Sequence, residues 1–143
     1  TISLFLAKQL GENGQVIGVE IVPEAIENAK ENARLNGITN ARFYAGAAEE
    51  VVPRLISPTG GEAAKADVVI VDPPRKGCHQ TLLDTIALMA PQRIVYVSCD
   101  PATLARDVKI LGEKGYEVQK CRGCDMFPMG GHVETVCLLS KKV

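Results

Sequence analysis

Two short apolar runs, each followed at once by a polar tetrad, constrain the fold of this chain most. Residues 66–71 precede the tetrad 72–75 (DPPR), and residues 93–97 precede the tetrad 98–101 (SCDP). Short runs rich in Val and Ile are typical of buried strands in a parallel sheet. Because ligands bind at the carboxyl ends of such strands, the two tetrads should bring an acid and a thiol to one crevice.

Strand and helix patterns alternate along the rest of the sequence. Strands are predicted at 16–21, 41–45, 66–71, 93–97, 116–120 and 133–139, and helices at 2–10, 23–36, 49–52, 80–89 and 101–114, with loops at 57–62 and 123–132. This alternation, with a β-hairpin-like ending, predicts an α/β fold, a doubly wound and mostly parallel sheet with helices on both faces.

The bulk composition places the chain among ordinary single domains. Its 143 residues are enough for one domain with a hydrophobic core, spanning residues 1–143. The formal net charge of −1 gives no global signal for nucleic acid, so any RNA contact must be local or lie outside the chain. The apolar stretches are too short for a membrane span.

The sequence opens directly on a helix pattern after Thr1, which predicts an N-terminally truncated fragment of a longer protein.

The cysteines give no sign of a disulfide framework or a metal site. They are Cys78, Cys99, Cys121, Cys124 and Cys137. An odd number in a domain of cytoplasmic character predicts reduced thiols. Cys121 and Cys124 have C-x-x-C spacing, but the only histidines, His79 and His132, do not complete a zinc site. We therefore predict no metal, and a structural hydrogen-bonding role for His132.

Two positions in the first third of the chain suggest nucleotide binding. Glu20 closes a predicted strand, where an acid can accept hydrogen bonds from a ribose diol. Ala47 lies in the turn after the next strand, the turn that abuts adenine in nucleotide-binding methyltransferases. The simpler interpretations are a solvated carboxylate and a plain turn built on Gly46. The expected Gly-rich cofactor loop would lie upstream of Thr1.

The first tetrad holds an acid at the predicted crevice. Its two prolines stiffen the exit from the strand, so Asp72 is fixed as an acceptor for a planar substrate. Amino-group methyltransferases place an aromatic residue after such a Pro-Pro pair. Here Arg75 stands in that place, which argues against chemistry on the adenine N6 atom.

The second tetrad supplies a candidate nucleophile. Cys99 precedes Asp100, the predicted N-cap of a helix, and Pro101, its predicted first residue. A helix N-terminus favours a thiolate, so Cys99 is predicted to be the nucleophile, against the alternative of an inert buried cysteine. Glu134 heads the last predicted strand and is either a solvated strand end or a base held near the site.

Together these motifs resemble one family, the bacterial RNA uracil-C5 methyltransferases that act on 23S rRNA and on the tRNA T-loop. The matching stretches are 16–20, 72–77, 98–101 and 125–134. The resemblance covers essentially the whole chain, and the closing strand pair suits the Rossmann-like S-adenosylmethionine-dependent methyltransferase domain. It implies Cys99 as nucleophile and Glu134 as base. It further implies that Glu20, Ala47 and Asp72 contact S-adenosylmethionine or the target base.

The implied activity is methylation of uridine C5 in RNA, with 23S rRNA favoured over tRNA. The family's RNA-binding module and any iron–sulfur cluster would lie outside this chain, so the fragment alone is expected to be inactive. An RNA cytosine-C5 methyltransferase is one rival, although that family shows Asp-Ala-Pro-Cys where DPPR stands here. An NAD-binding domain is another, which leaves Cys99 and Glu134 unexplained. An inert structural piece is a third.

Overall fold

The computed structural model describes residues 1–56, 66–126, 128–130 and 133–142. The chain folds as two compact units, Thr1–Arg54 and Leu55–Val143. The loop predicted at 57–62, part of the segment 123–132 and the predicted role of His132 lie outside the described residues. Among the helices that are described, none has the length and apolar character needed to cross a membrane.

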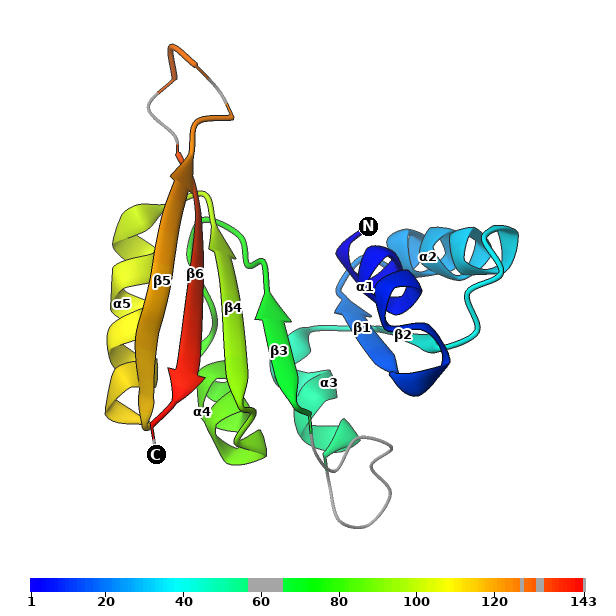
Figure 1. Cartoon of the computed structure of the whole chain (residues 1–143), viewed down its shortest axis with the longest axis horizontal. Helices are drawn as coiled ribbons and strands as arrows, with labels where there is room; N and C mark the ends of the chain where they lie inside the picture. Colours follow the sequence, from blue (N-terminus) through cyan, green and yellow to red (C-terminus); the bar gives the residue numbers. More distant parts are fainter. Residues whose placement is uncertain (57–65, 127, 131–132, 143) are drawn as a thin grey trace. The chain divides into compact units, whose positions relative to one another are not determined.

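The first unit is a two-stranded parallel sheet packed against helices (Figure 1). Its elements are α1 (Ile2–Leu10), the 3-10 turn η1 (Gly11–Asn13), β1 (Val16–Glu20), α2 (Pro23–Leu35), β2 (Ala41–Ala45) and most of α3 (Ala48–Leu55). Asn40 Nδ2 lies 2.7–2.9 Å from the carbonyl oxygens of Ala7, Gly11 and Gly14. This one side chain therefore fastens the end of α1 and the following turn to the start of β2.

Helix α2 forms where the sequence predicts it. Pro23 stands in its first turn, where a missing N–H has no cost, and Asn36 caps its end. Ile26 and Ala33, seven residues apart, are buried on one face. On the exposed surface of α2, Arg34 and Glu31 form an ion pair at 2.7 Å, a spacing that stabilises exposed helices modestly.

The second unit is a four-stranded mixed sheet with two helices behind it in Figure 1. Its elements are β3 (Val68–Val71), α4 (Gln80–Met89), β4 (Arg93–Ser98), α5 (Pro101–Glu113), β5 (Tyr116–Cys124) and β6 (Glu134–Lys141). The strand order is β3-β4-β6-β5. The fully buried side chains include Leu83, Ile86, Ile94, Tyr96, Leu111, Tyr116 and Leu139.

The mostly parallel arrangement predicted from the sequence, with its hairpin-like ending, is found among the described strands. The β1–β2 and β3–β4 pairs are parallel, but β6 pairs antiparallel with both β4 and β5. The reason is the route of the chain: after α5 it runs up β5 and turns back, so that β6 inserts between β4 and β5. A strand that returns by such a turn must run against its neighbours.

Strand β5 is also longer than predicted. It continues through Gly123 and Cys124, which were expected to be irregular, and its pairing with β6 ends at Cys124 opposite Glu134. A register shift between Val118 and Lys120 marks a bulge in this ladder. Backbone pairing with β6 thus outweighs the weak local strand preference of Gly123.

Candidate active site

The first unit brings Glu20 and the turn of Ala47 together at one sheet edge. Glu20 pairs with Ala45 at the carboxyl ends of β1 and β2. The Gly46 amide donates to the Glu20 carbonyl at 2.9 Å, which holds the turn against the strand end. The Glu20 side chain is exposed, and its Oε1 accepts a hydrogen bond from the Val22 amide at 3.0 Å. An oriented carboxylate therefore lies beside a backbone turn at the edge where parallel sheets bind ligands.

The second unit sets Asp72 and Cys99 at the carboxyl edge of its own parallel pair. Val71 pairs with Tyr96 at the end of the β3–β4 ladder. Asp72 follows directly and is exposed, while Cys99 follows the end of β4 and is half-buried. The two apolar runs thus form neighbouring parallel strands, as predicted, and the acid and the thiol leave them at the same edge.

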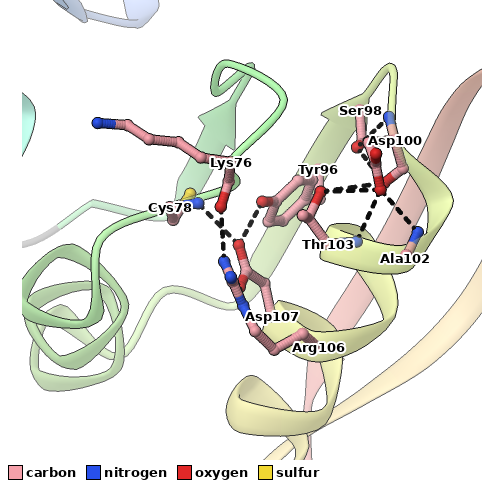
Figure 2. A network of polar contacts seen from close by, with 9 residues as sticks. All are labelled: Lys76, Cys78, Tyr96, Ser98, Asp100, Ala102, Thr103, Arg106 and Asp107. Carbon is pink, nitrogen blue, oxygen red and sulfur yellow. Dashed lines mark hydrogen bonds and ion pairs between the residues drawn. The ribbon is translucent and has the colours of Figure 1, made fainter.

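The backbone around Cys99 is tied on both sides. Ser98 Oγ donates to the Asp100 carbonyl at 2.9 Å and accepts from the Asp100 amide at 3.0 Å. Asp100 Oδ1 accepts from the amides of Ala102 and Thr103, each at 2.9 Å (Figure 2). The predicted N-cap and the predicted Pro101 at the first turn are confirmed. Cys99 therefore lies directly before the N-cap of a well-capped helix.

Register brings Glu134 to the same edge as Cys99. Ser98 pairs with Thr135 in the antiparallel β4–β6 ladder. This is the last pair of the ladder, and Cys99 follows Ser98 while Glu134 precedes Thr135. Glu134 is half-buried at the start of β6. A thiol that follows one strand and a carboxylate that begins its neighbour thus lie at the same end of the sheet.

A buried carboxylate close to this edge was missed at the sequence level. Asp107 of α5 is 0% exposed. Its Oδ2 accepts from the Tyr96 hydroxyl at 2.5 Å and from the Cys78 amide at 2.8 Å, and its Oδ1 accepts from Arg106 Nε at 2.8 Å (Figure 2). Burial, aided by the bond to Asp107, raises the pKa of Tyr96, so the phenol keeps its proton and donates it. The available signal was an acid on the apolar stripe of α5, between Leu104 and Leu111.

The C-x-x-C cysteines do not converge. Cys121 pairs with Cys137 across the β5–β6 ladder, with their sulfurs 2.8 Å apart, whereas Cys124 pairs with Glu134. No group of three or more His, Cys, Asp or Glu side chains among the described residues could hold a metal ion.

Comparison with known proteins gives the family. Residues 1–142 match the family model described as "tRNA (Uracil-5-)-methyltransferase". The chain belongs to this tRNA (uracil-5-)-methyltransferase family. An uncharacterized RNA methyltransferase of Clostridium acetobutylicum is 55% identical over 141 residues, which cover 99% of this chain and 29% of that protein. One from Halalkalibacterium halodurans is 54% identical over 142 residues, which cover 99% of this chain and 30% of that protein.

One solved structure agrees with the family assignment, and a second shares the fold. The crystal structure of the Pyrococcus abyssi tRNA (uracil-54, C5)-methyltransferase in complex with S-adenosyl-L-homocysteine matches with a TM-score of 0.76 and 39% identity, over 95% of this chain and 30% of that one. TrmN from Thermus thermophilus, at 22% identity, shares the fold with a TM-score of 0.74 over 98% of this chain and 40% of that one. The predicted Rossmann-like methyltransferase fold is thereby confirmed for this member of the uracil-5-methyltransferase family.

Proposed function

We propose that this chain is the catalytic part of an S-adenosylmethionine-dependent enzyme that methylates C5 of uridine in RNA. The observation that carries the proposal is the last pair of the β4–β6 ladder, Ser98 with Thr135, because Cys99 follows Ser98 and Glu134 precedes Thr135 at the same end of the sheet. Family membership and the uracil-54 enzyme at 39% identity support the same substrate chemistry. We propose 23S rRNA as the first substrate to test and the tRNA T-loop as the alternative.

The residues at the first unit's sheet edge suit this cofactor. S-adenosylmethionine carries a ribose diol and an adenine ring. The exposed Glu20 carboxylate is an acceptor suited to the diol, and the adjoining turn at Ala47 offers backbone against which the ring can lie. Asp72 is a further exposed acceptor, at the end of β3. When bound, the cofactor supplies an electrophilic methyl group.

The chain's own residues would activate the uracil ring. Uracil C5 is a poor nucleophile, so the Cys99 thiolate adds to C6 and turns C5 into the nucleophilic carbon of an enolate. After C5 has gained its methyl group, Glu134 removes the C5 proton. The electron pair of that C–H bond re-forms the C5–C6 double bond as the C6–S bond breaks and the thiolate leaves. The target base must be unstacked to reach these groups.

The test is covalent trapping on RNA that contains 5-fluorouridine, because fluorine at C5 blocks proton removal. The full-length protein that contains this sequence would be incubated with S-adenosylmethionine and fluorinated 23S rRNA or tRNA. We expect an adduct that survives denaturing gels, is absent in Cys99→Ala and persists in the control Cys124→Ala, which removes another half-buried thiol. The RNA that is trapped identifies the substrate. An adduct that persists in Cys99→Ala, or no adduct with either RNA, would refute the mechanism.

We further propose that RNA binding and the Gly-rich cofactor loop belong to other parts of a longer protein. The chain spans about 30% of the length of the curated relatives it matches. The isolated 143-residue chain should therefore bind S-adenosylmethionine weakly or not at all. Calorimetric titration checks this, and low-micromolar affinity of the isolated chain would contradict it.

A further inference from the structure

The buried Asp107 carboxylate ties together three elements of the second unit. It accepts hydrogen bonds from Tyr96 on β4, from the Cys78 amide in the segment after β3, and from Arg106 beside it on α5 (Figure 2). Arg106 Nη2 also lies 2.7 Å from Asp107 Oδ1 and donates to the Lys76 carbonyl at 2.9 Å. A fully buried carboxylate is costly unless it is paired and hydrogen-bonded, and here both oxygens are engaged.

Two of these contacts reach the backbone of the segment that follows Asp72. The Lys76 carbonyl and the Cys78 amide are fixed by Arg106 and Asp107, and between them the Gly77 amide closes a turn onto the Pro74 carbonyl at 2.8 Å. The segment is therefore held by a helix that lies about 30 residues further along the chain, in addition to the stiffness of its prolines.

The segment lies so close to the side chains of Arg106 and Asp107 that only glycine fits at position 77. Gly77 has φ +78°, a conformation that other residues rarely adopt. A Cβ atom at this position would lie 2.5 Å from Arg106 Nη2 and 2.6 Å from Asp107 Oδ2. Any larger residue at 77 must push the segment away from the carboxylate or break the network.

The same carboxylate also fixes the strand and the helix that flank Cys99. Tyr96 lies on β4 three residues before Cys99, and Asp107 lies on α5, which begins just after Cys99. Tyr96 also pairs with Val71, the residue before Asp72. Asp107 thus contacts both the part of the fold that carries the thiol and the part that carries the acid.

We propose that Asp107, assisted by Arg106, is a positioning residue that sets the place of Asp72 relative to Cys99. This inference rests on the proposed function, in which Asp72 contacts the cofactor. Asp107 itself is buried and touches neither cofactor nor RNA; it acts through the segment 72–78. A change that loosens this segment should therefore weaken cofactor binding because it displaces Asp72. Removal of the Asp72 side chain should weaken binding through loss of the same contact.

A double-mutant cycle in the full-length protein tests this route. S-adenosylhomocysteine affinity would be measured by calorimetry for wild type, Asp107→Asn, Asp72→Ala and the double variant. We expect Asp107→Asn to weaken binding by about tenfold or more, since a displacement near 1 Å at a site can cost that much. In the Asp72→Ala background the same change should cost little more, because residues that act through one another are not additive. A merely structural role would lower the melting temperature without this coupling.

Asp84→Asn is the matched control. Asp84 pairs at 2.6 Å with Lys114 at the C-terminal end of α5, and its loss should leave S-adenosylhomocysteine affinity unchanged. If Asp107→Asn does not fold, Arg106→Leu replaces it, because that change removes the contact to the Lys76 carbonyl and leaves Tyr96 and Cys78 on the carboxylate. Unchanged affinity, or losses that add in full with those of Asp72→Ala, would overturn the positioning role. If the wild-type protein itself fails to bind S-adenosylhomocysteine, the proposed function has failed, and this inference with it.

Discussion

The two units bury very different kinds of core around their site residues. In the first unit the buried apolar side chains are few and mostly small: Ala7, Ile26 and Ala33. The second unit buries large side chains from five elements: Leu83 and Ile86 of α4, Ile94 and Tyr96 of β4, Leu111 of α5, Tyr116 of β5 and Leu139 of β6. A two-stranded sheet with few buried side chains has little stability of its own. A four-stranded sheet packed against helices buries a larger apolar core and is more stable.

This difference in core size matches the role proposed for each unit, cofactor binding in the first and covalent chemistry in the second. Glu20 and Ala47 are held in the first unit by backbone hydrogen bonds at a sheet edge. In the packed unit Glu134 begins β6 and Cys99 directly follows β4, tied by Ser98 and Asp100 on either side. Covalent chemistry needs atoms held within fractions of an ångström, and a packed scaffold supplies that precision. Binding a flexible cofactor tolerates a softer support.

The largest expected effect is that of Glu134→Gln, in the packed unit. Removing a general base costs about 10²–10⁴-fold in rate, so methylation turnover should fall by this amount in the full-length protein. Because Cys99 can still add to C6, a covalent RNA adduct should accumulate with ordinary uridine, without fluorine. Gel analysis of the adduct together with turnover of labelled methyl groups checks both statements. Wild-type turnover in this variant would show that Glu134 is not the base.

Because the cores differ, shortening a buried side chain should lower the free energy of unfolding more in the second unit than in the first. Leu111→Ala in the second unit should lower the free energy of unfolding by about 2–5 kcal/mol, the usual range for a fully buried leucine. Ile26→Ala in the first unit should cost less, because few large neighbours surround the cavity it leaves. Urea unfolding of both variants, followed by circular dichroism, measures the two costs. An equal or larger cost at Ile26 would contradict the contrast between the units.

A smaller and different effect is expected at Glu20. Glu20→Gln removes the charge that would accept the ribose diol, and hydrogen bonds to charged groups are worth about 1.5–3 kcal/mol. KM for S-adenosylmethionine should rise by about tenfold or more, with kcat nearly unchanged. Steady-state kinetics measure this split, with Glu24→Gln on α2 as the control. A fall in kcat at constant KM would mean that Glu20 acts in the chemical step. It would contradict the assignment of cofactor binding to the first unit and catalysis to the second.

The parts of the fold that could be predicted are those encoded by local signals. The bounds of α4 and β2 follow from apolar period and from the residues that end each element, and both match the structure. The edge that carries Asp72 and Cys99 follows from one rule, that parallel strands end on the same side. A capped helix after Cys99 follows from the order Asp100-Pro101.

The parts that could not be predicted depend on partners distant in sequence. The insertion of β6 between β4 and β5 is a choice of neighbours, and nothing local in residues 133–139 specifies it. From the sequence, Asp107 is an ordinary charged residue of a helix. Its role becomes visible only when the fold brings Tyr96 and Cys78 within hydrogen-bond distance of it. A charge on an apolar stripe shows that partners must exist, because an unpaired buried carboxylate would be costly, but it does not say which ones.

The smallest effect separates two thiols within the packed unit. Cys137 is 3% exposed, and burial, with the Cys121 sulfur 2.8 Å away, raises its pKa to about 12. Since the thiolate is the reactive form, iodoacetamide at pH 8 should modify Cys137 far more slowly than the half-buried Cys99. Mass spectrometry of peptides from timed reactions measures both rates, and equal rates would contradict the assignment.

The pH dependence of Cys137 has a definite sign. A raised pKa means that the fold prefers the protonated thiol, so its contribution to stability is full below the ordinary value of 9.0 and is lost as the pH rises toward about 12. Labelling of Cys137 should accelerate over the same window. In Cys121→Ala the hydrogen-bond acceptor is gone but burial, the larger cause, persists, so labelling should accelerate at a lower pH than in wild type and still above the ordinary range. A profile unchanged by Cys121→Ala would leave burial alone as the cause.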